Sequence, residues 1–211
     1  MITLGLDTSE KDGGAALYSE GEFAEEIRFE EPLRHAESIF PAIDGLLDRC
    51  KLDKEKIGLV SVNQGPGSFT GLRIGLASAK GLCQALGVPL VGVDGTIAYH
   101  TRIPDAKRVC VIIASRRDLY YARWFVENRA KGETRPIHAE ELIEVLFDEE
   151  RELTLIGSGA PAVYAQVKGN RSIRLAPEEL NRPSPLAVAR LGAGQKEQLT
   201  KQKELLVREM E

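Results

Sequence analysis

The chain has 211 residues, of which 43 % are hydrophobic and 28 % charged, and its net charge is −4. This length allows one large domain or two smaller lobes, and the composition is ordinary for a folded globular protein. The negative net charge excludes a generally basic nucleic-acid-binding surface and leaves only a local basic patch open.

The cysteines and the apolar runs indicate the compartment. The three cysteines, at positions 50, 83 and 110, form no C-x-x-C pair, which favours buried thiols in a reducing environment over disulfides or a zinc site. No apolar run approaches ~20 residues, and the chain starts directly with a strand pattern. We therefore expect a cytoplasmic protein that does not contact a membrane.

The first half of the chain predicts a three-stranded meander followed by crossover units. Apolar residues alternate at period two in the early strands and recur at helical spacing beyond Pro32. A strand, a helix and a further strand then form a unit whose strands should be parallel. We expect strands at 2–6, 15–18, 23–29, 57–63 and 88–93, and helices at 36–50, 70–86 and 96–102.

The second half predicts a reduced copy of the same pattern. The segment 127–136 is polar, so a loop or a weak third strand is expected there. Prolines at 183 and 185 precede a last helix. We expect strands at 108–114, 119–126, 153–156 and 172–175, and helices at 138–147 and 160–167.

Two β-β-β-α-β-α lobes in tandem are typical of the ATPase fold of actin, hexokinase and Hsp70. We therefore expect an α/β protein of this actin-like (ASKHA) class, with two lobes of mixed sheet flanked by helices and a reduced second lobe. The predicted boundaries are 1–103 for the first lobe and 104–194 for the second. The charged tail, 195–211, docks back on the first lobe or is disordered.

A glycine-rich stretch from Gly65 to Gly75 links the strand 57–63 to the helix 70–86. Such a turn leaves backbone N–H groups free at a helix start and favours anion binding. The alternative is structural, with Ser68 and Thr70 as N-cap candidates worth ~1 kcal/mol. Glycine inside a helix costs up to ~1 kcal/mol, which indicates a close neighbour on that face. That neighbour is a partner helix or, within the protein itself, the sheet or the helix 36–50, and the residues alone leave these alternatives open.

Several segments together resemble the TsaB (YeaZ) family over about residues 1–193. The most specific is Gly-Pro-Gly-Ser-Phe-Thr-Gly-Leu-Arg-Ile-Gly at 65–75. The chain departs from the family at 114–118, where relatives usually read Asp-Ala-Arg-x-Gly-Glu, and at 206–208, where Leu-Val-Arg replaces Tyr-Leu-Arg. The other matching segments are Asp7-Thr8-Ser9, Arg34-His35, Pro41, Ala114-Ser115-Arg116, Gly157-Ser158-Gly159 and Pro183-Ser184-Pro185.

The resemblance implies a function without catalysis of its own. TsaB proteins are partners of TsaD, the transferase that threonylcarbamoylates adenosine 37 of tRNA. The resemblance thus implies a complex with TsaD and the ATPase TsaE, a homodimer when the chain is alone, and tRNA contact only within the complex. The signature turn comprises Gly65, Pro66, Gly67, Ser68, Phe69, Thr70 and Arg73, and the partner interface on helices 36–50 and 70–86 comprises Ile39, Ile43, Gly71, Gly75, Ser78, Ala79 and Leu82.

Catalytic and metal residues are not expected. The transferase relatives carry two histidines one helical turn apart, whereas here Ile39 follows His35 at that spacing, so we expect a capping or surface histidine. Ser68 is not in a G-x-S-x-G elbow. An M22-type peptidase homologue is accordingly a weak alternative.

Nucleotide binding is the remaining chemical possibility. Asp7, Thr8, Gly157 and Gly159 occupy the positions where an actin-like ATPase holds nucleotide, although turn residues that end strands explain them more simply. We expect no cofactor, and ATP binding only weakly or at an interface with partners. A small actin-like ATPase or kinase is the alternative function.

Overall fold

The computed structural model describes residues 1–29 and 35–196. Arg34 and the tail beyond residue 196, including the segment 206–208, lie outside the described residues. Within the described part, no helix is both long and apolar enough to cross a membrane.

The first lobe is a five-stranded mixed sheet in the order β3-β2-β1-β4-β5. The β1, β2 and β3 strands are antiparallel, while β1, β4 and β5 run parallel, as the predicted crossover unit requires. Its elements are β1 (Ile2–Asp7), β2 (Gly13–Ser19), β3 (Phe23–Phe29), α1 (His35–Cys50), the 3-10 turn η1 (Lys54–Lys56), β4 (Ile57–Asn63), α2 (Phe69–Leu86) and β5 (Leu90–Val93).

The second lobe repeats this topology, with strand order β10-β9-β6-β7-β8. Its helices α4 and α5 have 9 and 8 residues, against 16 and 18 for α1 and α2, so it is the reduced lobe that the sequence predicts. Its elements are β6 (Arg108–Ala114), β7 (Leu119–Val126), β8 (Arg129–His138), α4 (Ala139–Phe147), β9 (Leu153–Ile156), α5 (Ala160–Val167), β10 (Ile173–Leu175) and the 3-10 turn η2 (Glu178–Leu180).

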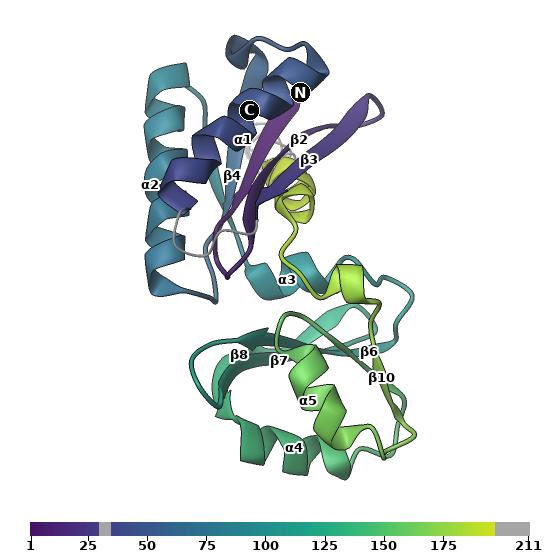
Figure 1. Cartoon of the computed structure of the whole chain (residues 1–211). Helices are drawn as coiled ribbons and strands as arrows, with labels where there is room; N and C mark the ends of the chain where they lie inside the picture. Colours follow the sequence, from purple (N-terminus) through teal and green to yellow (C-terminus); the bar gives the residue numbers. More distant parts are fainter. Residues whose placement is uncertain (30–34, 197–211) are drawn as a thin grey trace, which may run out of the picture.

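The two lobes lie one above the other, with the short helix α3 (Gly95–His100) between them (Figure 1). The expected α/β class with two lobes of mixed sheet is therefore confirmed. The predicted boundary at 103/104 lies in the loop between α3 and β6.

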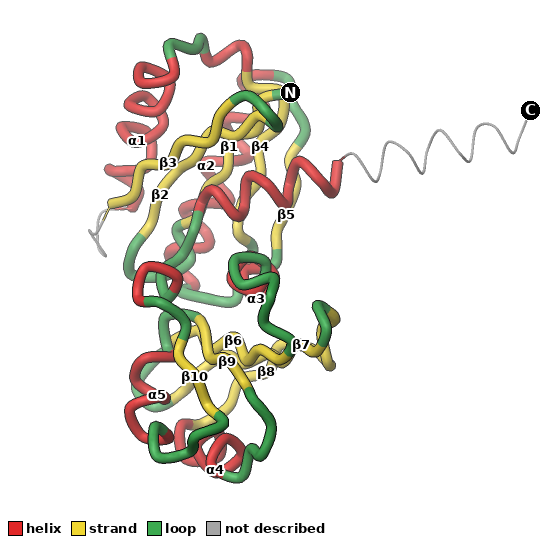
Figure 2. The backbone as a smooth tube through the Cα atoms, turned by 90° about the vertical axis from the view of Figure 1, so that its right-hand side faces the viewer, coloured by secondary structure: helices red, strands yellow, loops and turns green. Residues whose placement is uncertain are grey.

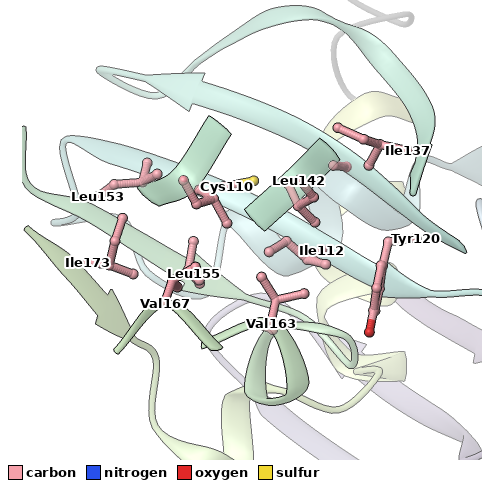
Figure 3. Packing of buried hydrophobic residues seen from close by; sticks show 13 residues of the cluster. Cys110, Ile112, Tyr120, Ile137, Leu142, Leu153, Leu155, Val163, Val167 and Ile173 are labelled. Atoms are coloured by element: carbon pink, nitrogen blue, oxygen red, sulfur yellow. The ribbon is translucent and has the colours of Figure 1, made fainter. Parts of the chain in front are cut away.

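Each lobe has its own apolar core. In the first lobe, Leu4 and Leu6 of β1 pack with Ile39 and Leu46 of α1. In the second lobe, side chains of the sheet meet those of α4 and α5, as Figure 3 shows for Ile112, Leu142 and Val163. Separate cores agree with the prediction of two lobes, because each layer of helices buries one face of its own sheet.

The β8 strand is the weak third strand that was one of the two alternatives expected at 127–136. It pairs with β7 from Leu119↔His138 to Val126↔Arg129, with one register irregularity. Most of its side chains are exposed, so it lacks the apolar alternation by which strands are recognised. Its charges and Pro136 are typical of an edge strand, whose outer side has no neighbouring strand to pair with.

The predicted second lobe, 104–194, includes most of the last helix, 185–196, and this part of the prediction is wrong. The helix returns to the first lobe and covers the face of the sheet opposite α1 and α2 (Figures 1 and 2). The Ser61 hydroxyl of β4 donates to the Val188 carbonyl oxygen at 3.1 Å. A Cβ on Gly5 would lie 2.4 Å from the Pro185 carbonyl oxygen, so this glycine permits the close approach.

Two arginines bond α3 to the second lobe and to the segment 179–182, which leads back to the first lobe. Arg123 of β7 forms an ion pair with Asp94 at 2.8 Å, and Asp94 also caps α3. Arg102, just after α3, donates to the main-chain carbonyl groups of Glu179, Leu180 and Arg182. The α3 helix is therefore bonded both to the second lobe and to the segment that leads back to the first.

Candidate functional site: the inter-lobe cleft and the α1/α2 surface

A cleft of about 1040 Å³ lies between the lobes. The first lobe contributes the turn after β1 and the start of α2, and the second contributes the turn after β6 and the turn after β9. Its lining includes Ser9, Glu10, Lys11, Asp12, His35, Ser68, Phe69, Ser115, Arg116, Ser158 and Arg182.

Asp7 forms a buried hydrogen-bond network at the end of β1. One carboxylate oxygen accepts from the backbone N–H of Ser9 at 3.0 Å and from its hydroxyl at 2.6 Å, and the other accepts from Asn63 Nδ2 at 3.0 Å. The Asn63 side-chain oxygen accepts from the Gly65 N–H at 2.8 Å. Burial raises the pKa of Asp7. The network therefore joins the turn after β1 to the signature turn.

The four residues predicted to hold nucleotide face the protein interior and do not line the cleft. Asp7 is 1 % exposed, and the Thr8 hydroxyl donates to the Gly71 carbonyl oxygen at 2.8 Å. A Cβ on Gly157 would lie 2.3 Å from the Ile112 carbonyl oxygen, and one on Gly159 would lie 2.6 Å from the Tyr120 ring. These residues shape the turns that border the cleft, which corrects their predicted placement.

Glu10 is the titratable group of the cleft that the sequence analysis missed. It accepts a hydrogen bond from the Tyr99 hydroxyl at 2.7 Å. Burial raises the pKa of its carboxyl to about 7. Its position directly after Asp7-Thr8-Ser9 was the only signal in the sequence, because Tyr99 lies far away along the chain.

The signature turn is hydrogen-bonded to the turn after β1. The Ser68 N–H donates to the Ser9 carbonyl oxygen at 2.6 Å, and the Ser68 hydroxyl caps α2 by accepting from the Gly71 N–H at 3.3 Å. The predicted capping role of Ser68 is confirmed, whereas Thr70 lies inside the helix. Phe69 is 73 % exposed and lies beneath the Arg73 guanidinium, 5.3 Å from the ring centre.

Five of the seven residues predicted for the partner interface are buried within the first lobe. Ile39, Ile43 and Ala79 belong to its core. A Cβ on Gly71 would lie 2.0 Å from the Thr8 carbonyl oxygen, and one on Gly75 would lie 2.4 Å from the Thr8 hydroxyl. These five cannot form the contact surface, because the small face of α2 packs on the turn after β1.

Ser78 and Leu82, the other two predicted interface residues, are partly exposed. A large residue at Gly75 would displace Thr8 and disturb the packing of the first lobe, so Gly75 is not a position at which the interface can be tested. The exposed apolar side chains of this region are different ones. They are Phe40 of α1 and Phe69 and Leu76 of α2, which we call the α1/α2 surface.

His35 is buried, contrary to the expectation of a capping or surface histidine. Its Nε2 lies 3.1 Å from the Lys11 carbonyl oxygen, and its ring lies 5.5 Å from that of Phe29. Among residues 1–29 and 35–196, no group of three or more His, Cys, Asp or Glu side chains is arranged to hold a metal ion. His35 thus ties the start of α1 to the turn after β1.

Comparison with known proteins identifies the family. The family model of TsaD, tRNA N6-adenosine threonylcarbamoyltransferase, matches residues 32–196. The tRNA threonylcarbamoyladenosine biosynthesis protein TsaB of Bacillus subtilis is 28 % identical over 196 residues, covering 89 % of this chain and 86 % of that protein. The structure of YeaZ from Pseudomonas aeruginosa superposes with a TM-score of 0.75 and 25 % identity, over 93 % of each chain. The chain belongs to the TsaB (YeaZ) family, within the wider family of TsaD.

Other relatives match the chain over shorter segments or only in fold. TsaB of Escherichia coli is 32 % identical over 129 residues, which is 59 % of this chain and 55 % of that protein. The transferase of Carboxydothermus hydrogenoformans is 38 % identical over 109 residues, and the match spans only 32 % of that protein. The ADPNP-bound activator of 2-hydroxyisocaproyl-CoA dehydratase from Clostridium difficile shares the fold, with a TM-score of 0.53 at 12 % identity.

Proposed function

We propose that the chain is a non-catalytic subunit in the formation of N6-threonylcarbamoyladenosine in tRNA, and that it acts by binding a TsaD transferase. The observation that carries this proposal is the match to TsaB of Bacillus subtilis over 89 % of the chain and 86 % of the relative. The non-catalytic role is supported by α1. The transferase relatives carry the second of two histidines where this chain has Ile39, and Ile39 is fully buried in the core.

The α1/α2 surface is the proposed site of contact with TsaD. Phe40, Phe69 and Leu76 are 45 %, 73 % and 38 % exposed. Exposed aromatic and aliphatic side chains are typical of protein interfaces, where their burial contributes much of the affinity. In the absence of TsaD, we propose that two copies of the chain pair through this surface. TsaE and tRNA would join only through the complex.

A small ATPase or kinase is the alternative, and the shared fold with the ADPNP-bound dehydratase activator is what favours it. The argument against this alternative is that the Asp7 carboxylate, which was predicted to hold nucleotide, is already hydrogen-bonded to Ser9 and Asn63. We propose no resident cofactor, and ATP binding only weakly or at an interface with partners.

Reconstitution tests the proposed function. Purified TsaD and TsaE from the same organism, tRNA, ATP and a threonylcarbamoyl donor are combined with and without this chain, and modified adenosine is quantified by mass spectrometry. We expect modification only when the chain is present, and no ATP turnover by the chain alone. Full modification without the chain would refute the subunit role, and ATP turnover by the chain alone would favour the ATPase alternative.

A charge on the α1/α2 surface should weaken TsaD binding. We expect Phe69→Asp to lower the affinity about 100-fold, because it removes an exposed aromatic anchor and buries a charge in the interface. The monomer should stay folded, because a negative charge in the first turn of α2 interacts favourably with the positive end of the helix dipole. Calorimetric titration measures the affinity.

Phe147→Asp on α4 is the matched control for this variant. Phe147 is 64 % exposed, and it lies in the second lobe, away from the α1/α2 surface. The control should bind TsaD like the unaltered chain. Equal affinity for both variants would mean that TsaD does not use the α1/α2 surface.

A further inference from the structure

We propose that Lys11, Arg116 and Arg182, which line the inter-lobe cleft, contact backbone phosphates of the tRNA in the complex with TsaD. This inference rests on the proposed function, because it names where the substrate of that complex would touch the chain. It goes beyond the subunit role, which requires only that the chain binds TsaD.

Three turns that are distant in the sequence bring these cations to one cavity of about 1040 Å³. Lys11 lies in the turn after β1, Arg116 in the turn after β6, and Arg182 between η2 and the last helix. All three residues are exposed. Cations that line one cavity can act together on a polyanion, whereas a charged pair in a single turn is usually only solvated.

The main chain of each cation is held in place at the cleft. The Lys11 carbonyl oxygen lies 3.1 Å from Nε2 of the buried His35, and the Arg116 carbonyl oxygen accepts from the first N–H of β7 at 3.1 Å. The Arg182 carbonyl oxygen accepts from Arg102 Nη1 at 2.5 Å. The fold therefore sets the three positions, and binding needs to order only the side chains.

The lining of the cleft has an excess of positive charge, although the net charge of the chain is −4. Its acidic residues are Glu10 and Asp12. Glu10 is only 8 % exposed, and burial raises its pKa to about 7, so near neutral pH it carries only part of a negative charge. Neither Lys11 nor Arg116 forms an ion pair with another residue that the structure describes. The charge of these two cations is therefore available to an anion.

Backbone phosphates of RNA fit this arrangement better than a free nucleotide does. Asp7 and Gly157, which were predicted to hold nucleotide, face the interior and do not line the cleft. Exposed lysine and arginine side chains bind phosphates without reading the bases, and such contacts position a nucleic acid on a protein. They also release counterions, so the logarithm of the affinity falls with the logarithm of the salt concentration by about 0.7 to 0.9 per neutralised phosphate.

The experiment titrates fluorescently labelled, unmodified tRNA with the complex of the chain and TsaD, at salt concentrations from about 50 to about 200 mM. Arg116→Gln removes one cation from an exposed position, so the chain should stay folded. We expect the salt slope to fall by about 1 and the tRNA affinity at about 0.1 M salt to fall about sixfold, because one phosphate contact is lost. Lys11→Gln should have the same effect, and the two losses should add.

Arg129→Gln is the matched control, since it makes the same change at another exposed arginine. Arg129 pairs with Val126 at the end of β7, whereas Arg116 precedes the start of that strand. The length of the strand separates the two arginines by about 20 Å. The control should therefore leave both the tRNA affinity and the salt slope unchanged.

The affinity of each variant for TsaD, measured by calorimetry, separates this inference from the proposed function. If the unaltered chain does not bind TsaD, the proposed function is wrong, and the tRNA titration is made with the chain alone, where the same losses are expected. Unchanged tRNA affinity and salt slope in Arg116→Gln and Lys11→Gln, or equal losses in Arg129→Gln, would overturn the phosphate contacts. A loss of TsaD binding in place of tRNA binding would assign these cations to an acidic face of the partner protein and would overturn them as well.

Discussion

Replacing Gly71 by alanine should lower the free energy of unfolding by about 3 kcal/mol, in the range of overpacking substitutions at tightly packed sites. The added methyl group would lie 2.0 Å from the Thr8 carbonyl oxygen. That oxygen belongs to the backbone, and the Thr8 hydroxyl is itself bonded to the Gly71 carbonyl oxygen at 2.8 Å. Neither partner can move without breaking the contact between α2 and the turn after β1.

Gly81→Ala is the matched control, since it makes the same change in the same helix. A Cβ on Gly81 meets nothing within 4 Å, and the residue is exposed. Alanine should therefore raise the free energy of unfolding by up to ~1 kcal/mol through its higher helix propensity. Urea denaturation followed by circular dichroism measures both variants. Stabilisation by both substitutions would show that α2 does not rest on Thr8.

The order of elements could be predicted because most helices and strands bury one face. The ranges 23–29, 108–114, 119–126, 153–156 and 160–167 agree with the structure residue for residue. The β8 strand could be predicted only as one of two alternatives, because its exposed side chains carry no alternation and its strand conformation depends on pairing with β7. Apolar periodicity arises from the burial of one face, so it does not identify an edge strand whose side chains are mostly exposed.

The sequence does not identify what packs against the face of α2 that is formed by small residues. A row of small residues indicates that something lies close, but not whether that neighbour is a partner or the same chain. The structure places Thr8, more than sixty positions earlier in the chain, against Gly71 and Gly75. The exposed surface of the same helix is instead provided by Phe69 and Leu76.

The polar groups of the site were missed for a related reason. Glu10 and Tyr99 are 89 positions apart, and Asp7 and Asn63 are 56 apart. Neither Glu10 nor Asn63 belongs to a short motif that predicts such contacts. Conversely, Asp7, Gly157 and Gly159 lie at or just after strand ends, where a residue can face the cleft or the interior. The sequence pattern does not distinguish these two directions.

Asn63→Ala should lower the free energy of unfolding by about 4 kcal/mol, because it leaves several buried polar groups without a partner. Asn63 donates to Asp7 and to the Ser9 hydroxyl, each at 3.0 Å, and accepts from the Gly65 N–H at 2.8 Å. The exposed neighbour provides the control, and Gln64→Ala should change the stability by no more than about 0.5 kcal/mol. Chemical denaturation of both variants measures the difference.

The pH dependence of this loss identifies its cause. The bond from Asn63 favours ionised Asp7 and so lowers its pKa, although burial raises the pKa by more. Asp7 therefore already reduces stability as the pH rises above its usual pKa of 3.8, and without Asn63 this reduction becomes larger. The loss caused by Asn63→Ala should thus become greater as the pH rises through the folded-state pKa of Asp7, which lies above 3.8. An equal loss on both sides of this titration would mean that the packing of Asn63 matters and its bond to Asp7 does not.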